Sequence, residues 1–105
     1  MNKKITLTDE NYIKCFESKS TSIRLGIKNF NVGNSSIENV ETGNEMDCMI
    51  TKVELLKVSD LNDFHAVRDG FCGIRELIEE LKNCYGDISS QDYITRVTFK
   101  TKYNK

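Results

Sequence analysis

Hydrophobic and polar positions alternate in two segments that lie far apart in the chain. Residues 20–25 alternate in type until Gly26, and residues 93–100 alternate more cleanly. Because successive side chains of a strand point to opposite faces, both segments are predicted to be half-buried strands. Residues 31–34 have the composition of a turn. The weaker pattern of residues 35–40, followed by residues 41–44, predicts a further strand that leads into a hairpin turn.

The longest predicted strand covers residues 46–58. Its apolar residues change parity, from the even-numbered Met46, Cys48 and Ile50 to the odd-numbered Val53 and Leu55. A strand that keeps one face buried through such a change needs one extra residue, so a bulge or bend is expected near Thr51 and Lys52. Long bent strands of this kind are typical of small barrels.

Three segments show helical patterns. Thr8 is predicted to cap a short helix with an acidic first turn, whose charges suit the positive end of the helix dipole. A turn of helix is expected after Leu61, to about residue 67. The longest helix follows Gly73 and ends at Gly86, because its apolar residues recur at i, i+3, i+4 and i+7. These apolar residues are Ile74, Leu77, Ile78, Leu81, Cys84 and Tyr85.

The order of these elements predicts a small α+β domain. A helix, several strands, two helices and a closing strand fit a mixed β-barrel with flanking helices. The 105 residues are enough for one modest core, so residues 1–105 are predicted to form a single domain. Residues 101–105 are expected to be a frayed tail.

Composition limits the classes of function. With 15 basic and 16 acidic residues the net charge is −1, so any binding of nucleic acid requires a local basic patch. The four cysteines form no Cys-x-x-Cys pair, and His65 is the only histidine, so we expect no metal and no other cofactor. The N-terminus does not read as a signal peptide and no apolar run is long enough to cross a membrane. A cytoplasmic protein without a membrane partner is expected.

The segment from Glu17 to Arg24 is the strongest candidate for chemistry. Lys19 precedes the first long strand, on which Ser22 and Arg24 should share a face. Residues 21, 23 and 25 should point to the opposite face. A hydroxyl, an ammonium and a guanidinium are thereby gathered beside the edge of the core. The segment is either a polar strand surface or the floor of a site for an anionic or polar ligand.

Short motifs spread over residues 12–100 add to this interpretation. In chain order they are Lys19-Ser20-Thr21-Ser22-Ile23-Arg24, Val32-Gly33-Asn34, Thr42-Gly43, Ile50-Thr51-Lys52-Val53-Glu54, Asp60-Leu61, Ala66, Asp69-Gly70-Phe71, Glu76-Leu77, Tyr85 and Val97-Thr98-Phe99. In their order and spacing they resemble the activating signal cointegrator homology (ASCH) domain, which belongs to the PUA-like superfamily. The resemblance implies a PUA-like barrel, a cleft beside residues 19–24, and an association with RNA or nucleobases.

One branch of small single-domain members implies a specific reaction. These proteins hydrolyse the acetyl amide of N-acetylcytidine, and their motif reads Gly-x-Lys-Thr-x-Thr-Ile-Arg. Matched to it, Lys19 is the activating base, Ser22 the nucleophile and Asp69 the third catalytic group, while Arg24 is the motif arginine. Glu17 stands in place of the glycine, Ser22 in place of threonine, and Asp69 in place of glutamate.

Two functions therefore remain open. The first is a module that binds RNA or a modified nucleobase or nucleoside in a cleft lined by Lys19, Ser22 and Arg24. The second is a metal-independent amidohydrolase of acylated cytidine that uses Lys19, Ser22 and Asp69. The sequence also allows non-functional roles, in which Lys19 and Arg24 form a solvated strand edge and Asp69 caps a helix or turns the chain. We expect Glu76, Glu79 and Glu80 to lie on the solvated face of the long helix. Phe16, Phe64 and Phe71 are expected to lie in the core.

Overall fold

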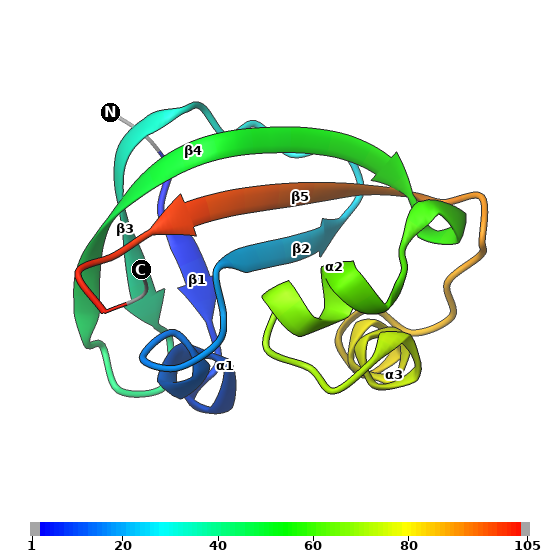
Figure 1. Cartoon of the computed structure of the whole chain (residues 1–105), viewed down its shortest axis with the longest axis horizontal. Coiled ribbons are helices and arrows are strands. Elements are labelled where there is room, and N and C mark those ends of the chain that lie inside the picture. The colour runs from blue at the N-terminus through cyan, green and yellow to red at the C-terminus, as the bar shows by residue number, and fades with distance from the viewer. Residues whose placement is uncertain (1–2, 104–105) are drawn as a thin grey trace.

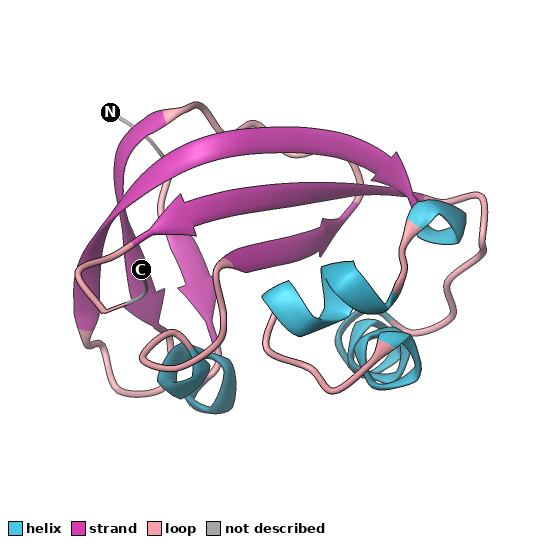
Figure 2. Ribbon diagram, viewed as in Figure 1, coloured by secondary structure: helices cyan, strands magenta, loops and turns pink. Residues whose placement is uncertain are grey.

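A computed structural model describes residues 3–103, which form a strongly curved sheet; in the view of Figure 1 the helices lie below its arch. The strands are β1 (Ile5–Leu7), β2 (Thr21–Leu25), β3 (Gly33–Asn39), β4 (Glu45–Lys57) and β5 (Tyr93–Lys100), and the helices are α1 (Asp9–Lys14), the 3-10 turn η1 (Val58–Asp60), α2 (Asp63–Arg68) and α3 (Ile74–Tyr85). In Figure 2, α1 lies below the end of the sheet that contains β1 and β3, and α2 and α3 lie below the other half. No helix within residues 3–103 combines the length and apolar character needed to cross a membrane.

The five strands of the described chain form one sheet in the order β1-β3-β4-β5-β2. β1 and β3 are parallel, and the other neighbours are antiparallel. The two edge strands, β1 and β2, lie close to each other. Arg24 of β2 donates hydrogen bonds to the backbone oxygen and to the hydroxyl of Thr6 in β1. The sheet is therefore a nearly closed barrel. The predicted α+β fold with a mixed, barrel-like sheet is confirmed.

The predicted bulge in β4 is confirmed. Ile50 pairs with Phe99 and Lys52 with Thr98, so Thr51 is the extra residue. The bulge lets one strand serve both halves of the sheet, because the buried parity changes there. β4 ends at Lys57 instead of residue 58, since Val58 begins η1.

Strand β1 was not predicted from the sequence. It has only three residues, too few for an alternating pattern to stand out. Its position is specified by pairing with β3, where Ile5 lies opposite Ile37 and Leu7 opposite Asn39. Both isoleucines are fully buried. Long-range pairing therefore decides this strand, with little contribution from its local pattern.

The β3–β4 hairpin is confirmed, although β3 begins at Gly33, inside the expected turn. The buried Asn39 holds the hairpin together, because its Oδ1 accepts hydrogen bonds from the backbone N–H groups of Glu41 and Thr42. Gly43 has φ +80°, which glycine adopts without steric cost. The Glu41 carboxylate in turn accepts the backbone N–H of Asp9 at 2.6 Å.

Helix α1 therefore receives its cap from the hairpin. Thr8 occupies the N-cap position as predicted, but its side chain makes no capping bond to the helix backbone. Its hydroxyl accepts from Asn11 Nδ2 at 3.1 Å instead. This bond links α1 to the turn between β3 and β4 and so holds the helix against one end of the barrel.

The core is divided into two clusters by the sheet. The first fills the barrel and includes Val97 and Phe99 of β5, and the second lies between the sheet and the helices α2 and α3 and includes Ile94. Alternate side chains of β5 thus point into different apolar clusters, on the two faces of the sheet. Phe71 is buried as expected, but the core position expected for Phe16 and Phe64 is wrong, since their exposed fractions are 43% and 63%.

The chain end described by the structure folds back toward α1. The rings of Tyr103 and Phe16 lie 4.5 Å apart between centroids. This contact explains why Phe16 is only partly covered, since its neighbour is itself a surface residue. The rest of the expected tail, residues 104–105, lies outside the described residues.

Candidate functional site

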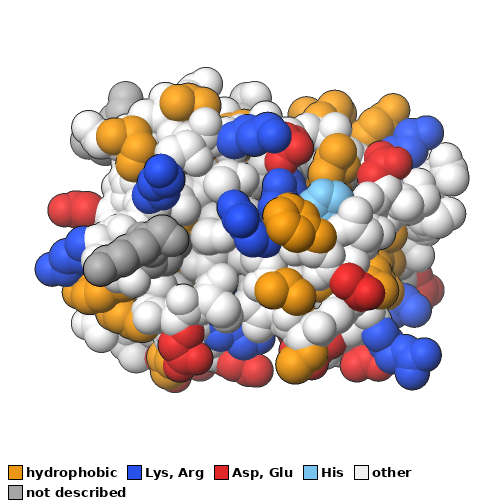
Figure 3. Space-filling model, in the orientation of Figure 1, with side chains coloured by type: hydrophobic (Ala, Val, Ile, Leu, Met, Phe, Trp, Pro, Cys, Tyr) orange, Lys and Arg blue, Asp and Glu red, His pale blue; other side chains and the backbone are white. Residues whose placement is uncertain are grey.

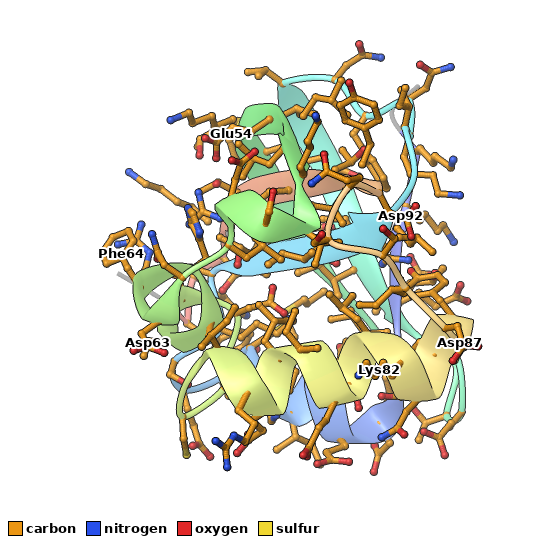
Figure 4. The ribbon with its side chains drawn as sticks, turned by 90° about the vertical axis from the view of Figure 1, so that its right-hand side faces the viewer. Glu54, Asp63, Phe64, Lys82, Asp87 and Asp92 are labelled. Atoms are coloured by element: carbon orange, nitrogen blue, oxygen red, sulfur yellow. The ribbon has the colours of Figure 1, made fainter. Side chains whose placement is uncertain are left out.

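A cleft lies between the β2 edge of the barrel, the β1–α1 junction and α3. The side chains predicted for a site, Lys19, Ser22, Arg24 and Asp69, all line it. Figure 4 shows α3 running below β2, with α1 behind it. The cleft has a volume of about 100 Å³. This is below the usual range for a pocket that encloses a whole drug-sized ligand, so a single chemical group fits and the rest of a ligand must lie outside.

Lys19 and Asp69 form a buried ion pair at the floor of this cleft. Lys19 Nζ lies 3.1 Å from Asp69 Oδ1, and it donates to the backbone oxygen of Asp69 at 3.0 Å. Their side chains are only 3% and 6% exposed. Asp69 is the C-cap of α2, and the backbone N–H of Ser20 donates to the neighbouring Arg68 carbonyl. These bonds hold the start of β2 against the end of α2.

Thr21 also binds Asp69, which the sequence did not indicate. The Thr21 hydroxyl donates to Asp69 Oδ1 at 2.9 Å, and Thr21 is fully buried. Burial raises the pKa of Asp69, although the Lys19 charge, the Thr21 and Lys19 hydrogen bonds and the Arg24 charge act in the opposite direction. The carboxyl is therefore held in a place where its ionisation has an energetic cost.

Ser22 and Arg24 share a face of β2, as predicted. Arg24 Nε donates to Ser22 Oγ at 3.0 Å, and the same guanidinium contacts Thr6 across the open side of the barrel. Burial lowers the pKa of Arg24, but guanidinium groups stay charged in proteins. The cleft thus contains a fixed positive charge next to a nearly buried hydroxyl.

Helix α3 contributes a wall that the sequence analysis did not assign to the site. Glu80 accepts a hydrogen bond from Asn11 Nδ2 at 3.0 Å and lines the cleft, so its placement on a solvated face was wrong. Leu77 and Leu81 are buried beside it, and Tyr85 is 40% exposed. The signal in the sequence was an apolar helix stripe that continues to Tyr85, beyond the part of the core able to cover it.

Phe71 forms the wall behind the ion pair. It is buried, and the ammonium groups of Lys14 and Lys19 lie 4.0 and 6.0 Å from its ring centroid. Both cations lie within the range of a cation–π contact with the ring, which stabilises it there. Within residues 3–103, no three His, Cys, Asp or Glu side chains come together as metal ligands. The chemistry available here is that of two carboxylates, two cations, hydroxyls and aromatic rings.

Comparison with known proteins identifies the fold. An ASCH domain from Lactobacillus crispatus superposes with a TM-score of 0.73 at 14% identity, over 93% of this chain and 79% of that one. Protein EF3133 from Enterococcus faecalis, assigned to the DUF984 family, gives a TM-score of 0.64 at 12% identity, over 94% and 76% of the two chains. No family model matches the sequence, and no curated protein matches it significantly. The chain thus has an ASCH-like fold.

Proposed function

We propose that the protein binds a nucleobase, as part of a nucleoside or of single-stranded RNA, in the cleft beside β2. The observation that carries the proposal is the convergence of Lys19, Ser22, Arg24 and Asp69 on one largely buried site. The similarity to two solved structures, one of them an ASCH domain, supports an ASCH-like fold for this chain.

The polar groups of the cleft suit the edge of a base. Arg24 supplies donors, and the carboxylates of Asp69 and Glu80 are acceptors. A base carries both kinds of group on its Watson–Crick edge, which proteins read with matched donors and acceptors. The apolar side of the cleft, from Leu77 and Leu81, suits a ring face. The small volume favours insertion of one base, with its sugar outside.

Titration of cytidine and N-acetylcytidine by calorimetry tests the proposal. We expect binding by the wild type and at least about a tenfold loss in Arg24→Ala, because a charge-assisted hydrogen bond contributes about 1.5–3 kcal/mol. Arg24→Lys keeps the charge but not the planar donors, and should lose most of the same affinity. Arg75→Ala, at an exposed residue of α3, is the control.

The RNA arm uses gel retardation of single-stranded RNA at rising salt. If the cleft binds a base of single-stranded RNA, the protein should retard the RNA. This retardation should weaken as the salt concentration rises and should be lost in Arg24→Ala. Wild-type protein that binds neither the nucleosides nor RNA at low salt would contradict the proposal. Circular dichroism of each variant separates lost binding from lost folding.

A second function is hydrolysis of an acylated cytidine, supported by the lining of the cleft, which includes Ser22 together with Arg24 and the Lys19–Asp69 pair. In this reaction Ser22 Oγ attacks the amide carbonyl while the neutral form of Lys19 accepts the hydroxyl proton; as the C–N bond breaks, Lys19 gives this proton to the leaving amine of cytidine, and water then hydrolyses the acyl-Ser22 ester to release acetate. Arg24, which already donates to Ser22 Oγ, stabilises the developing oxyanion. Asp69 orients Lys19 through their contact at 3.1 Å. No metal is required for these steps.

Release of acetate from N-acetylcytidine tests the hydrolase. Turnover should be abolished in Ser22→Ala and in Lys19→Ala, whereas Ser59→Ala, at an exposed serine of η1, should retain it. Intact substrate after prolonged incubation with the wild type would rule the reaction out. Calorimetric binding without turnover would leave the nucleobase-binding function in place.

A further inference from the structure

A second groove joins the candidate cleft on the other side of Arg24. It is lined by Lys3, Lys4, Lys28, Phe30, Thr6, Arg24 and Tyr85. The last three of these residues also line the candidate cleft. The two depressions therefore adjoin each other at Thr6, Arg24 and Tyr85. We call the second depression the lysine groove.

The lysine groove concentrates positive charge in a protein with a net charge of −1. Lys3 and Lys4 lie directly before β1, and Lys28 lies in the loop between β2 and β3, so the fold brings them together. On the face shown in Figure 3, acidic and basic side chains are interspersed. The local patch that RNA or nucleotide binding requires is thus present beside the cleft.

The acidic neighbours of the groove do not cancel its charge. Lys4 is paired with Glu45 at 2.8 Å and also feels the charge of Glu38. No acidic side chain of the described residues lines the groove itself. The ammonium of Lys3 lies 5.4 Å from the ring centroid of Phe30, which places it over an apolar surface. With Lys28 and Arg24, the groove keeps an excess of cations.

We propose that the lysine groove binds the phosphate of the nucleotide whose base occupies the cleft. The inference rests on the proposed nucleobase site and specifies its ligand as a phosphate-bearing nucleotide, either free or within a single strand. Lys3 and Lys28 hold the phosphate, and Arg24 lies between the phosphate and the base. Tyr85, at the junction, offers a ring on which a sugar or a neighbouring base packs.

Comparison of cytidine, cytidine 5′-monophosphate and a single-stranded RNA tetranucleotide tests the inference by calorimetry at several salt concentrations. At low salt the monophosphate should bind about tenfold more tightly than cytidine, because charge-assisted bonds to phosphate add to the base contacts. In a Lys3→Gln/Lys28→Gln variant this advantage should disappear while cytidine affinity is unchanged. Arg75→Gln removes a similar charge about 15 Å along α3 from Tyr85 and should change neither ligand's affinity.

The titrations with cytidine 5′-monophosphate and with the tetranucleotide distinguish a free nucleotide from an RNA strand as the source of the phosphate. For a strand, the slope of log K against log salt should become steeper by about 0.7 for each further phosphate held, whereas a free-nucleotide site gives the same slope for both ligands. Equal affinities of cytidine and its monophosphate, or a double variant that keeps the monophosphate advantage, would overturn the inference and leave the nucleobase site intact.

Failure of the nucleobase site is a distinct result. If cytidine does not bind, the groove is tested by the tetranucleotide alone. Binding that is lost in the double variant and kept in Arg75→Gln supports the groove without the cleft. A tetranucleotide that does not bind, or that binds the double variant equally well, overturns the inference.

Discussion

Two adjacent hydroxyl residues of β2 have different environments at the site. Thr21 faces α2 and donates to the buried carboxylate of Asp69, while Ser22 faces the barrel and accepts from Arg24. Thr21 is therefore a structural partner of Asp69, and Ser22 presents its oxygen to the cleft. The alternation of the strand separates these roles, because neighbouring side chains point to opposite faces.

The substitution Thr21→Val tests the structural role of Thr21. Valine has nearly the same shape, but it leaves the buried Asp69 oxygen without one of its donors, so we expect a loss of about 1–3 kcal/mol in the free energy of unfolding. Urea denaturation measures this change. Thr51→Val, at the exposed bulge residue, should change stability by less than about 0.5 kcal/mol. Equal effects of the two substitutions would show that the Thr21–Asp69 bond contributes little.

At the scale of elements, the site depends on how α2 ends. Asp69 is the C-cap residue of α2, and Gly70 follows it with φ +92°. This conformation turns the chain back over Lys14 and Lys19, so that the end of the helix lies against the start of β2. A Cβ at Gly70 would be 3.0 Å from Lys14 Cδ and 3.4 Å from Lys19 Cβ.

The substitution Gly70→Ala should therefore affect both stability and binding. The left-handed conformation disfavours alanine by about 1–2 kcal/mol, and the close contacts with the lysines add to this cost. Gly43→Ala is a matched control, since Gly43 has φ +80° and open space around its Cβ position. Thermal unfolding should show the larger loss for Gly70→Ala, and only that variant should weaken cytidine binding. A larger effect of Gly43→Ala would contradict the contact argument.

At the scale of the whole molecule, the sheet separates two apolar clusters, and an ion pair lies on the side that faces α2. Arg96 Nη1 donates to Glu54 Oε1 at 2.7 Å across β4 and β5, and the Arg96 side chain is 7% exposed. Burial alone would raise the pKa of Glu54, but the hydrogen bond and charge of Arg96, with Lys52, lower it below 4.5. The unfolded chain therefore binds more protons than the native one between the native pKa and 4.5.

It follows that this pair stabilises the fold above pH 4.5 and that its contribution is lost as the pH falls through the native pKa. In Glu54→Gln we expect a loss of about 2 kcal/mol at pH 7, because Arg96 loses its ionised partner, and a smaller difference from wild type in acid. Urea denaturation from pH 7 to pH 3 measures both. Glu79→Gln, on an exposed face of α3, is the control. A difference that does not change with pH would contradict the assignment to this ion pair.

Local patterns in the sequence account for most of the elements. The parity change in β4 predicted a bulge near Thr51 and Lys52, and the helical stripe predicted α3, because strand and helix periods are properties of neighbouring residues. β1 was missed since its three residues are specified by pairing with β3. Thr8 is the N-cap as predicted, but the sequence did not show that Glu41 of the hairpin, and not Thr8, accepts the backbone N–H at the helix start.

The sequence by itself determined the α+β class, the order of the main helices and strands after β1 and, through its resemblance to ASCH domains, the residues to examine: Lys19, Ser22, Arg24 and Asp69. Only the tertiary structure decided that Thr21 binds Asp69, that α3 walls the cleft, and that Lys3 and Lys28 flank it. The physical reason is separation along the chain. Lys19 and Asp69 are 50 residues apart, and their contact depends on packing of β2 against α2, which no local period encodes.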